Sequence, residues 1–193
     1  RADSVATDAH KWLNVPYDSG LAIVADAAPH RAAMSMKASY LQRGTDEERI
    51  GMDWVPESSR RSRVIPLYAL FRALGQDGII GLVRRNCALA RRMAARLSAA
   101  PGVTILNEVV LNQVLVRFAG TNGGNADDTT RDVIARIQAE GTCWAGGAFW
   151  QGKQSMRIAV SNWSTTEADI DRSADAMLAG YKQATESQRL REN

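Results

Sequence analysis

The sequence has only two cysteines, Cys87 and Cys143, among its 193 residues. Two thiols so far apart are too few for a structural zinc site or a disulfide framework. Cys87 lies on an apolar helical stripe, so we expect it to be buried as a small hydrophobic side chain. This sparse use of cysteine fits a reducing compartment, and we predict a cytoplasmic protein.

Long hydrophobic runs and a strong charge imbalance are also missing. No apolar run approaches the ~18 residues of a membrane span, and no signal peptide is recognisable, so we expect no membrane partner. The net charge is only +3. A group of arginines shares one predicted helix: Arg84, Arg85, Arg91, Arg92 and Arg96. Because no aromatic residues interleave with them, we interpret them as a solvated helix face and not as a nucleic-acid-binding surface.

The first third of the chain is predicted to be a short hairpin followed by a long loop. Ser4–Thr7 and Leu21–Ala25 are β-like runs on either side of a turn around Lys11, and Ala27–Met36 is a short helix. Residues 36–59 are polar and broken by glycine and proline. A connection of this length is usually a lid or a binding loop, although a plain surface excursion has the same composition.

The remainder of the chain alternates helices with pairs of strands. A chain of this length can bury one good core or two small ones. We place a boundary near Gly75 and expect an α+β layer after it. The first two predicted helices are Arg63–Leu74 and Asp77–Ala99. The second of them has an inward apolar stripe, made of Ile80, Val83, Cys87, Ala90, Met93 and Leu97. A third helix is predicted from Asp127 or Asp128 to Ala139, and a fourth begins after a cap at Thr165 or Thr166 and frays beyond Gln183. The predicted strands are Val103–Leu106, Asn112–Phe118, Thr142–Trp150 and Gln154–Ser161.

The most informative stretch is Asp8-Ala9-His10-Lys11-Trp12, directly after the first β-like run. It places an amine at a strand-to-loop turn, beside a polar histidine and an aromatic side chain. A lysine that is desolvated can lose its proton and form an imine with an aldehyde cofactor. This segment therefore favours carbonyl chemistry at Lys11, whereas an isolated His-Lys pair is more often on a solvated surface.

The same segment resembles the lysine segment of the pyridoxal-phosphate-dependent group II amino-acid decarboxylases, which include the aromatic amino-acid, histidine and glutamate decarboxylases. Further segments match landmarks of that family in the same order. They are Ala38-Ser39-Tyr40-Leu41, Ser59-Arg60-Arg61, Ser155-Met156-Arg157-Ile158-Ala159-Val160-Ser161-Asn162, and Thr165-Thr166-Glu167-Ala168-Asp169-Ile170-Asp171. The resemblance is collinear and covers nearly the whole chain.

The resemblance implies an α/β fold, namely part of a fold type I transferase-like structure. Residues 1–75 would be the C-terminal part of the large cofactor-binding domain, with the lysine segment and a mobile loop. Residues 76–193 would be a small α+β domain. The chain is expected to be the C-terminal portion of a longer enzyme, whose preceding domain holds the cofactor ring and phosphate. Active sites of this fold type lie at a homodimer interface, so a homodimer is expected.

Two neighbouring residues are implied to hold the pyridoxal 5'-phosphate. Lys11 would form the internal aldimine with the cofactor aldehyde, the alternative being a solvated surface lysine. His10 would lie near the cofactor phosphate, to which its ring can donate a hydrogen bond, the alternative being a histidine satisfied within the turn. Asp8 departs from the asparagine that relatives often carry, and it has no assigned role. No metal site is expected.

Tyr40 matches the loop tyrosine of the family, and the resemblance implies a catalytic role for it. After decarboxylation a proton must return to the α-carbon to give an amine. A phenol on a closing lid can deliver that proton while excluding water and oxygen. The alternative is a half-buried tyrosine at the edge of a strand or loop.

Arg157 lies within an apolar strand, where an unpaired charge would be costly if buried. A guanidinium can grip a carboxylate through two parallel hydrogen bonds, and the resemblance implies that Arg157 binds the substrate α-carboxylate. The alternatives are an outward-facing strand arginine or an internal ion pair with Asp169 or Asp171.

The function implied by the resemblance is removal of the α-carboxylate of an amino acid by a pyridoxal-phosphate-dependent carboxy-lyase. Two other functions share the lysine, namely transamination and oxidative deamination to an aldehyde. A third alternative is that the chain by itself is an inactive fragment or a dimerising remnant that binds the cofactor weakly. The residues do not identify the substrate amino acid.

Overall fold

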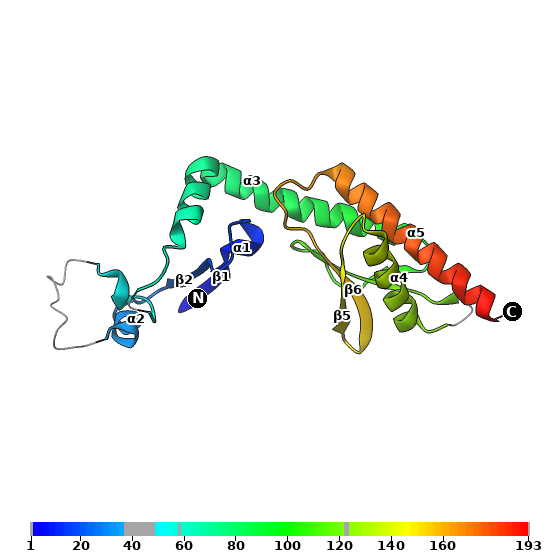
Figure 1. The fold of residues 1–193 in the computed structure, drawn as a ribbon, viewed down its shortest axis with the longest axis horizontal. Coiled ribbons are helices and arrows are strands. Elements are labelled where there is room, and N and C mark those ends of the chain that lie inside the picture. The colour runs from blue at the N-terminus through cyan, green and yellow to red at the C-terminus, as the bar shows by residue number, and fades with distance from the viewer. Residues whose placement is uncertain (1, 37–48, 58, 122–123, 193) are drawn as a thin grey trace. The chain divides into compact units, whose positions relative to one another are not determined.

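The computed structural model describes residues 2–36, 49–57, 59–121 and 124–192 (Figure 1). It divides into two compact units, Arg1–Gly75 and Gln76–Asn193. We call them the lysine unit and the sheet unit and describe each by itself.

The lysine unit is built around a two-stranded antiparallel ladder. Strand β1 (Ser4–Asp8) pairs with β2 (Gly20–Val24), with a register that runs from Ser4 opposite Val24 to Asp8 opposite Gly20. Between them lies a single helical turn, α1 (Ala9–Trp12), where the sequence pattern predicted only a turn. The helix α2 (Ala27–Met34) and a short 3₁₀ helix, η1 (Gly51–Asp53), follow.

The hydrophobic cluster of the lysine unit is small. Ala9, Val15 and Leu67 are its buried members among the described residues. Val5 and Ile23 of the ladder are 53% and 65% exposed. A two-stranded hairpin is marginally stable without further cover, so this unit gains little stability from its own core.

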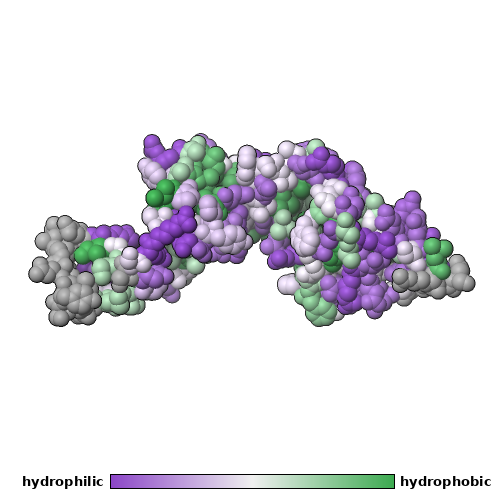
Figure 2. All heavy atoms as spheres, in the orientation of Figure 1, coloured by the Kyte–Doolittle hydropathy of each residue, from purple (hydrophilic) through white to green (hydrophobic). Residues whose placement is uncertain are grey.

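Helix α3 (Val64–Ser98) begins in the lysine unit and continues in the sheet unit. The two predicted helices, Arg63–Leu74 and Asp77–Ala99, correspond to its two parts, because Gly75 interrupts the helical backbone with φ 62°. A positive φ is readily adopted only by glycine. Figure 2 shows hydrophobic residues gathered over the first part of α3. The exposed apolar side chains there are Val64, Ile65, Tyr68, Phe71 and Leu74.

The sheet unit contains a four-stranded antiparallel sheet. Its strands are β3 (Val103–Ile105), β4 (Gln113–Phe118), β5 (Gly146–Trp150) and β6 (Lys153–Ala159), in the order β3-β4-β6-β5. Alternate residues of β4, namely Val114, Val116 and Phe118, are fully buried, as the alternating pattern predicted. They share one core with residues of α3, of α4 (Ala126–Glu140) and of α5 (Glu167–Glu192).

Tight turns and caps define the ends of these elements. Gln151 and Gly152 both have positive φ, 47° and 75°, which is the backbone of a two-residue hairpin turn between β5 and β6. Gly141 ends α4 in the left-handed conformation, as predicted. The predicted start of α4 was wrong by one or two residues: Asn125 is the N-cap, and its side chain accepts a hydrogen bond from the Asp127 amide.

Three further sequence predictions for the sheet unit need correction. Helix α5 does not fray beyond Gln183 but continues to Glu192. Strand β5 begins at Gly146, four residues later than predicted. The buried stripe of α3 was only partly right, since Ile80 is 37% exposed while Leu82 and Asn86 are buried. Cys87 is buried, which confirms its prediction, and both cysteines are free thiols.

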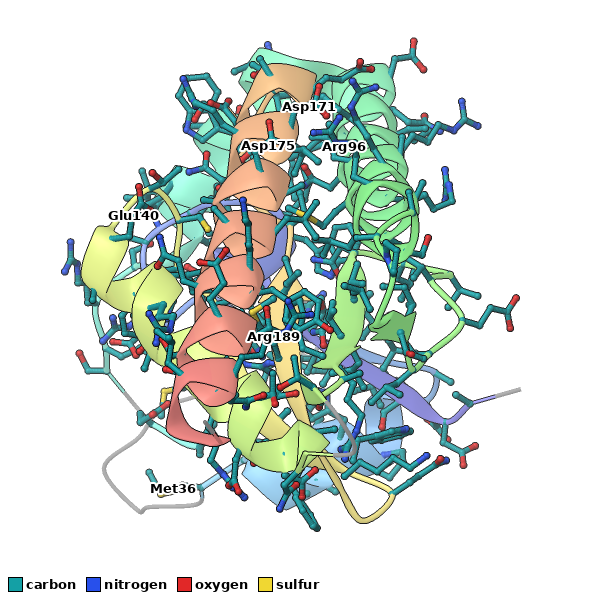
Figure 3. The ribbon with its side chains drawn as sticks, turned by 90° about the vertical axis from the view of Figure 1, so that its right-hand side faces the viewer. Met36, Arg96, Glu140, Asp171, Asp175 and Arg189 are labelled. Atoms are coloured by element: carbon teal, nitrogen blue, oxygen red, sulfur yellow. The ribbon has the colours of Figure 1, made fainter. Side chains whose placement is uncertain are left out.

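Ion pairs connect α3 to α5 on the surface of the sheet unit. Figure 3 shows Arg96 directed toward Asp171 and Asp175. Arg92 donates two hydrogen bonds to Asp171, at 2.9 and 2.7 Å, and also pairs with Glu167 at 3.0 Å. Arg92 and Arg96, which the sequence pattern assigned to a solvated face, are therefore engaged with carboxylates of the facing helix.

Candidate functional site

The segment around Lys11 is fixed by backbone hydrogen bonds and two unusual backbone angles. The amide of Ala9, which is fully buried, donates to the carbonyl of Ser19 at 2.8 Å and so extends the β1–β2 pairing into α1. Asn14 and Asp18 have positive φ, 53° and 68°. Asparagine and aspartate tolerate this conformation better than other residues with a side chain. These residues let the chain turn back sharply while α1 stays attached to the hairpin.

Lys11 lies on α1 with most of its side chain exposed. Its Nζ is 2.7 Å from Oδ2 of Asp8, and the two side chains are 65% and 43% exposed. The hydrogen bond from Lys11 and its positive charge hold the pKa of the Asp8 carboxyl below its ordinary value. The candidate amine is therefore accessible and has an acidic neighbour that the sequence alone did not assign.

His10 has an aromatic partner and an unsatisfied ring nitrogen. Its ring stacks on Tyr17, with centroids 4.3 Å apart and planes inclined by 21°. The Nδ1 atom is buried and has no hydrogen-bond partner among the residues that the structure describes. A buried polar atom without a partner costs free energy, so Nδ1 is a candidate contact for a ligand oxygen. The prediction that His10 contacts the cofactor remains a prediction.

A cavity of about 1000 Å³ lies beside this hairpin within the lysine unit. Asp8, Ser19 and Gly20 line it, together with His30, Trp54 and several arginines that include Arg61. Lys11 and His10 are not among its lining residues. Acidic and basic side chains thus line the same cavity. Within the segment Asp8–Trp12, Asp8 is the residue that lines it.

The loop after α2 contains a buried acidic group that the sequence pattern did not indicate. Asp53 is 2% exposed and pairs with Arg31 of α2 at 3.5 Å. Arg60 pairs with Glu57 at 3.2 Å, and both Arg60 and Arg61 line the cavity. The predicted lid tyrosine, Tyr40, lies outside the described residues, as do all residues from 37 to 48.

Arg157 lies in the sheet unit, on β6, opposite Leu115 of β4 and Gly146 of β5. It is exposed, and its guanidinium makes no ion pair or hydrogen bond within the described part of the chain. The alternative of an ion pair with Asp169 or Asp171 is wrong, because Asp169 binds Thr166 and Arg172 while Asp171 binds Arg92. The exposure of Arg157 agrees with the alternative of an outward-facing strand arginine, and its role in binding the substrate carboxylate stays a prediction.

Two relationships at the site were missed from the sequence, the Asp8–Lys11 pair and the His10–Tyr17 stack. Asp8 and Lys11 are three residues apart, and this spacing brings side chains together on a helix. The spacing becomes informative only when the lysine turn is known to be helical.

Among the described residues no cluster of three or more histidine, cysteine or acidic side chains could hold a metal. The described helices include none long and apolar enough to cross a membrane.

The fold is that of known decarboxylase structures. The crystal structure of Oryza sativa TDC with PLP and tryptamine matches this chain with a TM-score of 0.88 at 19% identity, covering 96% of this chain and 40% of that one. The predicted fold class, part of a fold type I α/β structure, is confirmed.

A family model, the pyridoxal-dependent decarboxylase conserved domain, matches residues 1–119. The chain belongs to this family, which confirms the resemblance first seen around Lys11. The histidine decarboxylase of Drosophila melanogaster is 25% identical over 171 residues, which are 88% of this chain and 20% of that protein. The phenylacetaldehyde synthase of Arabidopsis thaliana is 22% identical over 174 residues, 88% of this chain and 36% of that protein. The chain thus spans well under half the length of these relatives.

Proposed function

We propose that the full-length protein carrying this chain is a pyridoxal-phosphate-dependent carboxy-lyase that removes the α-carboxylate of an amino acid. The observation that carries the proposal is the Lys11 amine, which is held on α1 within the part of the chain that the family model matches. Residues 1–75 would belong to the cofactor-binding domain and residues 76–193 to a small domain.

The residues of the lysine unit fit the cofactor. Lys11 offers an exposed amine for the cofactor aldehyde. His10 offers a ring nitrogen, Nδ1, that has no hydrogen-bond partner among the described residues and is suited to a phosphate oxygen. When bound, pyridoxal phosphate supplies an electron sink for the negative charge that develops at the substrate α-carbon. Lys11 would hold this group covalently, and His10 would orient it.

Two residues outside this segment would act on the substrate. Arg157 would grip the α-carboxylate and so decide which bond is aligned for cleavage. Its exposure and its lack of a partner among the described residues support this role. Tyr40 would deliver the proton to the α-carbon. We further propose a homodimer, on the family resemblance, and a cytoplasmic location, which the two free thiols support.

Reductive trapping tests the central assignment. The full-length protein is incubated with pyridoxal phosphate and treated with borohydride, and the labelled peptide is identified by mass spectrometry. We expect the label on Lys11 and its loss in Lys11→Ala. The matched control is Lys153→Ala, which removes another exposed lysine and should leave the label in place. Labelling that survives in Lys11→Ala would contradict the proposal.

A second function is favoured by one comparison, because the phenylacetaldehyde synthase matches the chain about as well as the decarboxylase does. Oxidative deamination would consume oxygen and water and release an aldehyde, carbon dioxide, ammonia and hydrogen peroxide. Transamination would instead give a keto acid and keep the carboxylate. Product analysis with a panel of amino acids separates these three reactions. For a decarboxylase, Tyr40→Phe should reduce amine formation, and undiminished amine would remove the role of Tyr40.

A further inference from the structure

The Lys11 amine has a single carboxylate neighbour within the described residues. Asp8 Oδ2 lies 2.7 Å from Nζ, and the two residues are three positions apart at the start of α1. Residues at this spacing on a helix lie on one side of it. The backbone of Asp8 is fixed by its pairing with Gly20, and that of Ala9 by its bond to Ser19. The carboxylate is therefore presented to the amine by a well-ordered turn.

The usual task of an aspartate at this position is a different one. Asp8 is the N-cap residue of α1, and an N-cap carboxylate normally accepts a hydrogen bond from an amide of the first helical turn. Asp8 has the extended backbone of an N-cap, but its side chain makes no capping hydrogen bond. Helix capping therefore does not account for Asp8, whereas the contact with Lys11 does.

We propose that Asp8 is a positioning residue that holds the free Lys11 ammonium whenever the lysine is not joined to a carbonyl compound. This inference rests on the proposed function. For Lys11 to capture an aldehyde, its ammonium must leave Asp8 and pass one proton to solvent. The nitrogen then bonds to the aldehyde carbon, and the aldehyde oxygen leaves as water. When a substrate amine displaces the lysine, the released amine takes up a proton from solvent and the resulting ammonium returns to Asp8.

The charges around the pair agree with this role. Lys11 is the main cause of the lowered pKa of Asp8, and His10 contributes in the same direction. Asp8 stays ionised at neutral pH and is a poor acceptor for the lysine proton, which is why the proton goes to solvent. Asp18 is the other acidic residue that lines the cavity, and it pairs with Arg63 at 2.5 Å. Asp8 is therefore the carboxylate that pairs with Lys11.

The proposal predicts how neutralising Asp8 changes cofactor capture. Asp8→Asn keeps the size of the side chain but no longer stabilises the ammonium. We expect capture by Lys11 at neutral pH to become about twofold to fivefold faster, the range expected for the loss of one exposed ion pair. Asp8→Glu keeps the charge and should restore a capture rate close to that of the original protein.

The experiment uses the full-length protein without cofactor. After mixing with pyridoxal phosphate at neutral pH, samples are treated with borohydride at successive times, and label on the Lys11 peptide is quantified by mass spectrometry. Asp18→Asn is the matched control and should leave the capture rate unchanged. Asp8→Ser provides a second uncharged variant with a good N-cap side chain, and circular dichroism checks that each variant is folded.

The outcomes separate the two proposals. Faster capture in both uncharged variants supports the role of Asp8. Equal or slower capture with the label still on Lys11 overturns it and leaves the proposed function intact. If Lys11 is never labelled in any variant, the proposed function itself fails.

Discussion

His10 and Tyr17 stack their rings 4.3 Å apart across the turn that follows the candidate lysine. Tyr17 is 78% exposed, so its ring covers His10 without entering a core. The backbone around Tyr17 is held by the Ser19 hydroxyl, which donates to the carbonyl of Pro16 at 2.9 Å. The turn therefore orients a histidine whose Nδ1 is unsatisfied among the described residues.

Removing this stack should weaken cofactor binding without unfolding the protein. We expect Tyr17→Ala in the full-length protein to raise the Kd for pyridoxal phosphate about twofold to tenfold, the value of one aromatic pair. Tyr17→Phe keeps the ring and should bind normally. An absorbance titration measures both, and an unchanged Kd in Tyr17→Ala would show that the stack does not support the cofactor.

Arg157 should matter for substrate and not for folding, since it is exposed. We expect Arg157→Gln to raise KM about tenfold to a hundredfold, as a charge-assisted hydrogen bond to the carboxylate is lost, and to leave the thermal unfolding of the protein nearly unchanged. Lys153→Gln is the control on the same strand. Steady-state kinetics with the full-length protein decide the matter, and an unaltered KM would exclude Arg157 from substrate binding.

Gly102 is a site where any side chain should be destabilising. Its φ is 82°, and an added Cβ would collide with the hydroxyl of Tyr181, which donates to the Ala119 carbonyl at 3.0 Å. We expect Gly102→Ala to lower the free energy of unfolding by about 1–3 kcal/mol. Gly152→Ala has a similar φ but open space around it, so urea unfolding of both separates backbone strain from collision. Equal losses would show that the collision with Tyr181 is relieved.

The ion pairs between α3 and α5 should make stability depend on acid. Arg92 holds the pKa of Asp171 below its ordinary value of 3.8. The pair therefore stabilises the fold fully above that value, and the stabilisation is lost as pH falls through the lower, folded-state pKa. Asp171→Asn should lower Tm modestly at neutral pH, by less in high salt, and hardly at all in strong acid.

Thermal unfolding followed at several pH values and salt concentrations measures this effect. Glu186→Gln is the control, because the pair of Glu186 with Lys182 is long, at 4.0 Å, and highly exposed, so its loss should hardly change Tm. A Tm difference for Asp171→Asn that persisted in strong acid would mean that the side chain acts through packing and not through charge.

The sequence predicted the elements well where one periodicity dominates. The alternating residues of β4 and the glycine that ends α4 are where the pattern placed them. The sequence pattern failed where two assignments of a cap or of a buried face fit the residues equally well. Asn125 and the aspartates after it are all strong N-caps. Two overlapping stripes of α3 both have helical spacing. The buried stripe includes the polar Asn86, so the pattern did not select it as the apolar face.

Contacts between distant segments were beyond the reach of the pattern. The polar end of α5 looked too hydrophilic to stay helical, yet Gln188 donates to Thr129 of α4 at 2.8 Å and accepts from the amide of Thr121. At the candidate site the family motif pointed to Lys11 and His10, whose roles stay predictions. The direction of the Asp8 carboxylate and the position of the Tyr17 ring depend on the backbone angles of the turn, which the residue types alone do not determine.

The small cluster of Ala9, Val15 and Leu67 in the lysine unit has a consequence for proteolysis. The sheet unit has a core drawn from three helices and most of its strands, whereas the stretch that carries Lys11 has few apolar contacts of its own. Regions with few such contacts open most readily. A protease added to this chain under mild conditions should cut before Gly75 first and spare a fragment that starts near Gln76. The candidate amine of Lys11 thus belongs to the unit with the smaller hydrophobic core of its own.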